Sequence, residues 1–250
     1  MLNLNQKNIF ITGASSGIGK ACAILASNLG ANVILIGRNK ERLQETLNNL
    51  KEGNHLHYAI DITDYSILEK IIDESVEKIG KISGFIHSAG IETTKPLQAM
   101  SAPVYEKLFA TNIISAFEIS KHLSKKKNLD TMGASFVFIS SIMALYGKKG
   151  IIGYGSSKSA LIGGVKAMAL ELAPKNIRVN CILPGLVETE MTKKMLTSLP
   201  GNYINDIKNK YPLGIGKPED VANSTIFLMS DLSKWITGID FIVDGGYHIE

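Results

Sequence analysis

A tyrosine and a lysine stand four residues apart, at Tyr154 and Lys158, in a segment that predicts a helix. Side chains at this spacing lie on one face of a helix, so the two would be neighbours. A phenol has an ordinary pKa of about 10 and exchanges protons poorly at neutral pH. A lysine ammonium beside it would lower that pKa, which makes the pair a candidate for general acid and base chemistry.

The spacing of this pair is weak evidence by itself. A chain with eight tyrosines and frequent lysines contains such a pair by chance about as often as not. The alternative to a catalytic pair is a solvated pair on the surface. The neighbouring motifs therefore have to decide between the two interpretations.

Three glycines lie at the end of the first predicted strand, in the segment Thr12–Gly19, which reads TGASSGIG. Glycine lets the backbone turn tightly and approach a pyrophosphate closely. The free N–H groups and the positive dipole at the start of the next helix favour negative charge. A glycine-rich loop in this context is typical of dinucleotide-binding folds, so the sequence predicts a dinucleotide site rather than a simple turn.

The tip of the second predicted strand reads Ile36-Gly37-Arg38-Asn39 and carries no carboxylate. Dinucleotide folds that bind NAD place an acidic residue about 20 positions after the glycine turn, on the ribose 2′-OH. A guanidinium at this point attracts a 2′-phosphate through charge-assisted hydrogen bonds. The sequence therefore predicts a preference for NADP(H), with NAD(H) possible. A merely solvated Arg38 is the alternative.

Short runs rich in Val, Ile and Phe alternate with longer segments of helical period, as in βαβ units around a parallel sheet. Gly30 and Asp64 mark helix ends between the runs, and Pro218 opens the last helix. The predicted strands are Asn8–Thr12, Asn32–Ile36, His55–Ile60, Ile82–His87, Ser135–Ser140, Arg178–Leu183 and Asp240–Val243. The expected fold class is α/β, a Rossmann-type doubly wound parallel seven-stranded sheet with helices on both faces, in a single domain over residues 1–250.

One predicted helix, from Lys158 to Ala173, carries apolar residues on nearly every side. Such a helix must be covered all round. Its own sheet can cover one side, and the other can face either a second subunit or loops of the same chain. We expect the first, a homo-oligomer that is a tetramer or a dimer.

The composition excludes several classes of protein. With 45% hydrophobic and 20% charged residues the chain is typical of a compact globular protein. The formal charge of +4 comes from scattered lysines, so no nucleic-acid partner is expected. Cys22 and Cys181 belong to no Cys/His cluster, so no metal site is expected. Without a secretory segment, or an apolar run near the ~18 residues of a membrane span, we expect a cytoplasmic protein with no membrane partner.

Further short motifs follow the glycine turn in order along the chain. They are Asp61, Ser88-Ala89-Gly90, Asn112, Ser140-Ser141, Tyr154-x-x-x-Lys158, Pro184-Gly185 and Val243-Asp244-Gly245-Gly246. Each motif is weak alone. The ordered set, which runs from Thr12 to Gly246, resembles the short-chain dehydrogenase/reductase family.

This resemblance implies a catalytic tetrad of Asn112, Ser141, Tyr154 and Lys158. Tyr154 would be the general acid in reduction and the base in oxidation, and Ser141 would hydrogen-bond the substrate oxygen. Asn112 would anchor a water that links Lys158 to solvent. Lys158 would also donate to the cofactor's ribose hydroxyls.

Ser141 is preferred to Ser140 because it lies thirteen residues before the tyrosine, a spacing similar to the family's, whereas Ser140 should end the fifth strand. Alternatives are that Ser141 only caps a strand and that Asn112 only satisfies a backbone group inside a helix. The cofactor-binding residues that the resemblance implies are Gly13, Ser15, Ser16, Gly17, Ile18, Gly19, Arg38, Asn39, Asp61, Ile62, Ser88, Ala89, Gly90, Tyr154, Lys158, Pro184, Gly185, Val187 and Thr189.

The fourth strand ends in His87-Ser88-Ala89-Gly90, where the family usually has Asn-Asn-Ala-Gly. Since Ala-Gly is retained, close backbone approach to the adenosine ribose should persist. The structural hydrogen bond of an asparagine side chain is in doubt. Either His87 replaces it or His87 is a satisfied core histidine.

The segment 186–212 resembles the family's mobile substrate lid. Its apolar side chains at roughly helical spacing are Met191, Met195, Leu196, Leu199, Tyr203, Ile207 and Tyr211. An apolar lid suits a hydrophobic substrate, although the same stripe could be core or an oligomer contact. The run from Pro184 to Met191 is similar to that of 3-oxoacyl-acyl-carrier-protein reductases. Lys125–Lys127 would then dock an acidic acyl carrier protein, unless they only complement a helix dipole.

The predicted function is that of an NADPH-dependent carbonyl reductase and alcohol dehydrogenase whose substrate is a small carbonyl or alcohol, best a 3-oxoacyl thioester. The alternatives are a keto sugar, a steroid or another small ketone, which the fold does not separate. A catalytically silent NADP-binding regulator is the alternative from another class.

Overall fold

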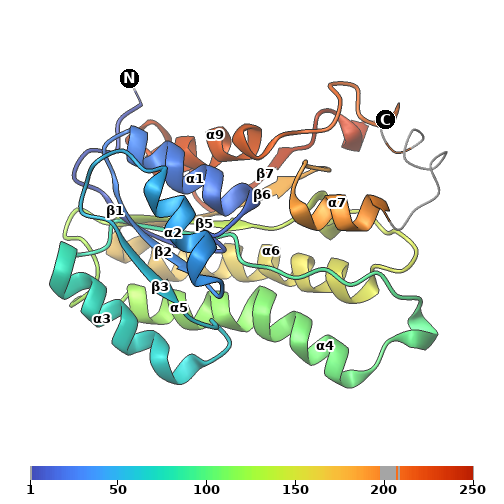
Figure 1. Cartoon of the computed structure of the whole chain (residues 1–250), viewed down its shortest axis with the longest axis horizontal. Coiled ribbons are helices and arrows are strands. Elements are labelled where there is room, and N and C mark those ends of the chain that lie inside the picture. Colours follow the sequence, from blue (N-terminus) through green and yellow to red (C-terminus); the bar gives the residue numbers. More distant parts are fainter. Residues whose placement is uncertain (1, 198–206, 208, 250) are drawn as a thin grey trace.

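The computed structural model describes residues 2–197, 207 and 209–249. Its centre is a seven-stranded, wholly parallel sheet in the order β3-β2-β1-β4-β5-β6-β7 (Figure 1). The strands are β1 Asn8–Thr12, β2 Asn32–Gly37, β3 Leu56–Ala59, β4 Gly84–His87, β5 Ala134–Ile139, β6 Ile177–Pro184 and β7 Asp240–Val243. The helices are α1 Gly17–Asn28, α2 Lys40–Asn48, α3 Leu68–Ile79, α4 Ala102–Phe109, α5 Ser115–Leu123, α6 Ile152–Leu172, α7 Glu190–Thr197 and α9 Pro218–Met229.

The predicted fold class is confirmed, and each predicted strand is present within about two residues of its expected bounds. Gly30 follows α1 with φ +92°, and Asp64 caps a short helical turn by accepting from the Ser66 N–H. One difference bears on the site. β5 ends at Ile139 rather than at Ser140, so both serines of the pair lie beyond the strand.

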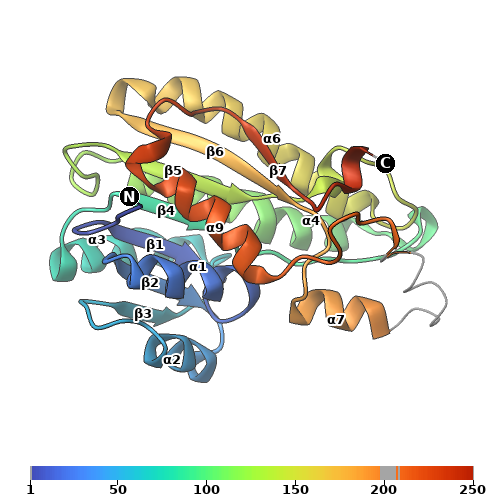
Figure 2. The same cartoon turned by 90° about the horizontal axis from the view of Figure 1, so that it is seen from above.

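Helices cover both faces of the sheet because alternate residues of each strand point to opposite sides. In β1, Phe10 packs into one apolar cluster and Ile9 and Ile11 into the other. The first cluster is covered by α3, α5 and α6, and the second by α1 and α9, with Leu43 of α2 (Figures 1 and 2). The sheet is therefore doubly wound, as predicted.

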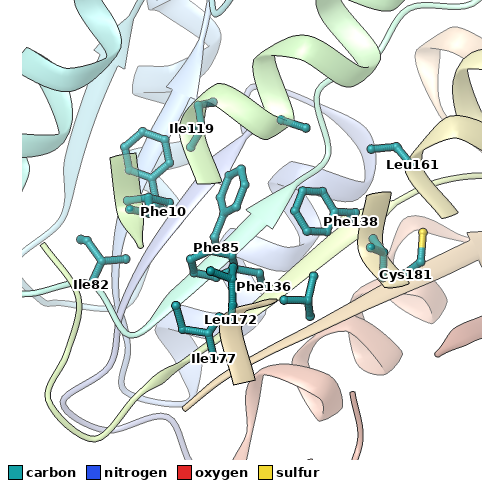
Figure 3. Packing of buried hydrophobic residues seen from close by; sticks show 14 of the residues in the cluster. Phe10, Ile82, Phe85, Ile119, Phe136, Phe138, Leu161, Leu172, Ile177 and Cys181 are labelled. Atoms are coloured by element: carbon teal, nitrogen blue, oxygen red, sulfur yellow. The ribbon is translucent and has the colours of Figure 1, made fainter. Parts of the chain in front are cut away.

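Four phenylalanines form the centre of the first cluster (Figure 3). The ring of Phe85 lies edge-on to Phe10, Phe136 and Phe138, with centroids 6.1, 5.6 and 5.6 Å away. Such edge-to-face pairs add about 0.5–1.5 kcal/mol each beyond burial. They join β1, β4 and β5, the strands whose carboxyl ends carry the candidate site.

The strand order creates a crevice at those carboxyl ends. The chain proceeds from β1 outward through β2 to β3, then returns to place β4 on the other side of β1. The loops that follow β1 and β4 therefore leave in opposite directions. Ligands of open α/β sheets bind at such a switch point.

The helix α6, which was expected to be covered on every side, is covered only in part. In α6, Leu161, Val165, Ala169 and Leu172 are buried, and Ile162 and Met168 pack at the edge of the same core cluster. Between Lys158 and Ala173, Leu170 is the one large apolar side chain that is exposed, at 82%. Most of the helix is thus covered by its own chain, and the argument for a second subunit rests on the face that carries Leu170.

Of the two roles considered for Lys125–Lys127, docking of an acyl carrier protein does not fit the position of these lysines. Lys125 pairs with Glu69 at 2.6 Å, and Lys127 pairs with Asp73 at 2.7 Å. The run lies beside Ile82, just before β4, at the end of the sheet where the strands begin and not at their carboxyl ends. An acyl carrier docked there would be on the wrong side of the sheet, because the site is built from residues after the strands.

None of the helices in the described part of the chain combines the length and the apolar character that crossing a bilayer requires.

Candidate active site

The glycine turn after β1 lies directly against the loop after β4. Gly13 has φ +67°, and a Cβ atom there would stand 2.7 Å from the Ala89 backbone nitrogen. At Gly19 a Cβ atom would stand 2.3 Å from the Gly13 carbonyl oxygen. Both positions therefore exclude any larger residue, the first by its backbone conformation as well.

The first turn of α1 is left open to an anion. Ser16 precedes the helix in an extended conformation, and its side chain accepts no hydrogen bond from the first turn. The first-turn N–H groups and the helix dipole therefore remain available to a negatively charged group. This arrangement fits the pyrophosphate of a dinucleotide.

A cavity of about 290 Å³ runs along the carboxyl ends of the strands from this turn. Most of the predicted cofactor-binding residues line it. They are Gly13, Ser15, Ser16, Gly17, Ile18, Arg38, Asp61, Ile62, Ser88, Ala89, Gly90, Tyr154, Lys158, Pro184, Gly185, Val187 and Thr189. The residues present thus fit an extended dinucleotide, with a guanidinium at one end and the tyrosine–lysine pair at the other.

Two predicted cofactor residues, Gly19 and Asn39, lie outside the lining of this cavity. Gly19 faces the Gly13 carbonyl, so its smallness lets α1 pack against the turn. The Asn39 side chain caps α2 by accepting from the Arg42 N–H at 2.8 Å. Both residues therefore stabilise the backbone around the cavity without lining it.

Several residues that line this cavity were not predicted to bind the cofactor. They are Ile36, Gly37, Ile60, Ile91, Thr111, Ile139, Ser140, Glu190, Met191 and Thr192. Most adjoin a predicted residue at a strand end, where strand registration decides which neighbour faces the cavity. Thr111 carries no motif, and only the packing of its helix places it there.

Arg38 is exposed on the cavity wall, opposite Asp61. Hydrogen bonds from Thr63 hold the pKa of the Asp61 carboxyl below its ordinary value, and the charge of Arg38 lowers it further. Among the described side chains, no carboxylate lies within ion-pair distance of Arg38. The neighbouring Arg42, by contrast, pairs with Glu190 at 2.7 Å. Arg38 is thus the guanidinium that can receive a phosphate.

Tyr154 and Lys158 occupy the first two turns of α6. The Lys158 ammonium lies 5.8 Å from the centre of the Tyr154 ring and donates to the Ile139 carbonyl oxygen at 2.9 Å. Lys158 is only 5% exposed, and burial lowers its pKa from 10.5 to about 8. The two side chains are neighbours, as their spacing predicts.

The net shift of the Tyr154 pKa is opposite to the one expected from the neighbouring lysine. The pKa of Tyr154 is raised to about 12, first because burial disfavours the phenolate. A hydrogen bond with Ser141 lowers the pKa, and the negative charge of Glu92 raises it. The phenol is therefore held as an acid, since desolvation outweighs the hydrogen bond that favours the phenolate.

The structure distinguishes the two serines after β5. The Ser140 hydroxyl is buried and donates to the Lys158 carbonyl at 2.8 Å, which ties the strand end to α6. The Ser141 side chain hydrogen-bonds Tyr154 and also accepts from the Met143 N–H at 3.2 Å. Ser141 is thus placed for the predicted contact with a substrate oxygen, while it also caps the following turn.

Asn112 lies in a π-helical turn, Ala110–Ile114, between α4 and α5. Its side-chain oxygen accepts from the Ile91 N–H at 2.9 Å, and its nitrogen donates to the Ile91 carbonyl at 3.0 Å and to the Ser157 hydroxyl at 2.9 Å. Both N–H donors of the amide and one lone pair of its oxygen are therefore used, and the water expected near Asn112 stays a prediction. The side chain holds the loop after β4 against α6, which makes Asn112 a positioning residue.

His87 replaces the family's asparagine in a different way. Its Nδ1 lies 3.0 Å from the Thr12 hydroxyl, which also accepts from the Ala89 N–H at 3.2 Å. This chain of contacts joins the ends of β1 and β4. Burial and the nearby charge of Lys158 lower the His87 pKa to about 3, so the ring is neutral. Its Nε2 makes no hydrogen bond of ordinary geometry among the described atoms, although a backbone group of Asn112 lies close enough to raise the His87 pKa slightly.

A second cavity of about 770 Å³ opens from the catalytic end of the first. The two cavities share Ser141, Tyr154, Gly185, Met191 and Thr192. Ser141 and Tyr154 therefore lie at the boundary between the two cavities, so a group bound in one adjoins a group bound in the other. This is the geometry required when one bound molecule reacts with another.

The predicted lid, 186–212, is only partly described. Met191, Ile207 and Tyr211 line the second cavity, and α7 forms its first helix. Leu199 and Tyr203 lie outside the described residues, and of the helix residues Met195 and Leu196 only the backbone is described. The described part agrees with a wall of the second cavity.

A family model whose description is enoyl-(acyl carrier protein) reductase matches residues 13–248. A short-chain type dehydrogenase/reductase from Mycobacterium ulcerans superposes with a TM-score of 0.92 at 30% identity, over 100% of this chain and 92% of that one. The chain belongs to the short-chain dehydrogenase/reductase family. It is therefore an NAD(P)-dependent oxidoreductase that acts on CH–OH and C=O groups.

Individual relatives differ in what they act on. A 3-oxoacyl-(acyl-carrier-protein) reductase FabG of Thermotoga maritima is 34% identical over 98% of this chain and 99% of its own length. A NAD-dependent glycerol dehydrogenase of Listeria innocua is 32% identical over 99% of this chain and 96% of its own. A 7α-hydroxysteroid dehydrogenase, solved with NADH and a 7-oxo bile acid, has a TM-score of 0.91 at 29% identity, over 98% and 95% of the two chains.

The burial of Lys158 predicts a pH-dependent stability difference. A lysine whose pKa is lower in the folded protein penalises folding while it is charged, and the penalty disappears as pH rises from about 8 towards 10.5. In the absence of cofactor, Lys158→Met should therefore be more stable than the wild type at pH 7, by up to about 3 kcal/mol, with the difference shrinking by pH 10. Urea unfolding of both proteins measures it.

Lys51→Met is the matched control, because Lys51 is exposed and its ammonium remains in solvent. Its difference from the wild type should not change with pH. A constant difference for Lys158→Met as well would show that the Lys158 ammonium is not desolvated.

Proposed function

We propose that this protein is an NADP(H)-dependent carbonyl reductase and alcohol dehydrogenase, and that a 3-oxoacyl thioester is its best substrate. The observation that carries the proposal is the junction of the two cavities at Ser141 and Tyr154. The fitted cofactor supplies a hydride when reduced and accepts one when oxidised. The chain's own residues must then bind the substrate and handle one proton.

The proton chemistry follows from the two pKa values. In reduction, the Tyr154 O–H donates its proton to the carbonyl oxygen as the carbonyl carbon gains the hydride. A pKa raised to about 12 keeps this phenol protonated at neutral pH. Ser141 donates a hydrogen bond to the same oxygen, where negative charge develops. The charge of Lys158 stabilises the phenolate that remains, and oxidation runs the same steps backward.

The substrate proposal rests on the similarity to the FabG relative and on the second cavity. That cavity has apolar walls, including Met143 and Met191, and two exposed lysines, Lys148 and Lys210, line it. Apolar walls suit an acyl chain, and the lysines suit an anionic carrier group. Keto sugars, steroids and other small ketones remain the alternatives, as the names of the other relatives illustrate.

A silent NADP-binding regulator is the alternative from another class. The arrangement of Tyr154, Lys158 and Ser141 argues against it, because each has the neighbours that the chemistry needs. We further propose that the protein works in the cytoplasm. An acyl carrier protein stays a possible partner, although not through Lys125–Lys127.

Tyr154→Phe should lower kcat by at least about 100-fold while the Kd for NADPH changes little, because only the proton donor is lost. NADPH oxidation with an acetoacetyl thioester measures the rate, and fluorescence titration measures binding. Tyr58→Phe, a change of the same kind in β3 away from both cavities, should leave kcat unchanged. Substantial turnover by Tyr154→Phe would remove the tyrosine from its role.

Arg38→Asp should lower the ratio of kcat/KM for NADPH to that for NADH by at least about tenfold, because it replaces an attractive contact to the 2′-phosphate with a repulsive one. Lys40→Asp makes the same change of charge two residues away, outside the cavity lining, and should alter the ratio much less. An unchanged ratio in Arg38→Asp would mean that this guanidinium is merely solvated and would leave NAD(H) as the alternative.

The face of α6 that carries Leu170 supports a homo-oligomer, a dimer or tetramer, because this large apolar side chain is 82% exposed in the single chain. Light scattering should give a mass that is a multiple of 27.1 kDa. Leu170→Glu should shift the mass toward the monomer, since a charge would be buried in the interface. A monomeric mass for the wild type would reject the proposal.

A further inference from the structure

A carboxylate stands in the wall of the second cavity. Glu92 lines it together with Ser141 and Tyr154, on the segment that leaves β4. Its negative charge raises the pKa of Tyr154, so the two groups lie within electrostatic range of each other. The proton-handling steps proposed above do not use Glu92.

The backbone on both sides of Glu92 is held firmly. Immediately before it, both the N–H and the carbonyl of Ile91 are bonded to the Asn112 side chain, at 2.9 and 3.0 Å. Shortly after it, the Lys95 N–H donates to the Gly150 carbonyl at 2.7 Å, on the loop that leads into α6. The segment that carries Glu92 is therefore anchored to the two elements that also carry Asn112 and Tyr154.

The carboxylate itself is half satisfied. Its Oε1 accepts a hydrogen bond from the Thr94 hydroxyl. Among the described side chains, no lysine, arginine or histidine lies within ion-pair distance of it. Glu92 is only partly exposed, and its other oxygen has no hydrogen-bond partner among the described residues. It is thus a fixed acceptor at the cavity wall.

The rest of the cavity makes this acceptor selective. Around it the walls include Ile142, Met143, Ile151 and Met191. A substrate that fills such a cavity displaces water from the carboxylate. A hydrocarbon group beside Glu92 would then leave a charge without a partner, which is strongly unfavourable, whereas an O–H group would replace the lost water.

We propose that Glu92 is a specificity-determining residue, whose carboxylate accepts a hydrogen bond from a hydroxyl group carried by the substrate near its reacting carbonyl. Among small ketones, one that carries a hydroxyl group and is reduced to a diol or polyol is then preferred to one with a plain hydrocarbon chain. This inference rests on the proposed carbonyl-reductase function and selects among its substrate classes.

The test compares two ketones of equal size, hydroxyacetone and 2-butanone, which differ by a hydroxyl in place of a methyl group. The kcat/KM of each is measured by NADPH oxidation for the wild type, Glu92→Gln and Glu92→Ala. An acetoacetyl thioester is measured beside them. Glu52→Gln, at an exposed position outside both cavities, is the control for the loss of a negative charge.

The wild type should prefer hydroxyacetone by at least about tenfold, because a site built to bind a hydroxyl discriminates against the analogue that lacks it. Glu92→Ala should reduce this preference to near unity, chiefly through KM, and Glu92→Gln should retain part of it, because its amide oxygen still accepts. Glu52→Gln should match the wild type. NADPH binding and thermal unfolding of the Glu92 variants verify that they fold.

Two results would be negative in different ways. In the first, the wild type turns over the thioester or 2-butanone but shows no preference for hydroxyacetone, or it shows a preference that Glu92→Ala leaves unchanged. Either outcome would overturn the role of Glu92 alone. Binding of NADPH without turnover of any of the three compounds would overturn the proposed function, and the role of Glu92 with it.

Discussion

The close contact between the turn after β1 and the loop after β4 is the constraint on which the site depends. Gly13 touches the Ala89 backbone, and Thr12 links the Ala89 N–H to His87. The two loops begin side by side because β1 and β4 are adjacent and parallel, and a crevice opens between them because they leave the sheet in opposite directions. The dinucleotide groove, the position of Asn112 and the wall that carries Glu92 all follow from this pairing.

Burial, rather than charge pairing, sets the chemistry of the catalytic pair. Desolvation raises the pKa of Tyr154 and lowers that of Lys158. The two pKa values, which ordinarily lie close together at 10.0 and 10.5, therefore move apart to about 12 and about 8. The result is a phenol that stays protonated and an ammonium that is costly to keep charged. Such opposed shifts in one cleft are typical of groups that exchange protons during a reaction.

The polar side chains around the site mostly position backbone rather than touch a ligand. Asn112 occupies both hydrogen-bonding groups of Ile91, Ser140 ties β5 to α6, and Asn39 caps α2. The groups left with spare capacity are few, chiefly Arg38 in the first cavity and Glu92 in the second. The residues proposed to determine cofactor and substrate specificity are therefore two charged side chains in the walls of two different cavities.

The sequence by itself determined the order of strands and helices, because apolar runs and glycine turns are local patterns that each element carries within itself. The order of its motifs, through their resemblance to a family, also predicted which tyrosine, lysine and serine lie together, and in the structure Ser141, Tyr154 and Lys158 are neighbours. Only the tertiary structure decided the use of Asn112, the direction of the Tyr154 pKa shift and the place of Glu92 in the substrate wall. Those properties depend on burial and on contacts with residues far along the chain. The same long-range packing places Lys125–Lys127 at the end of the sheet where the strands begin, away from the site.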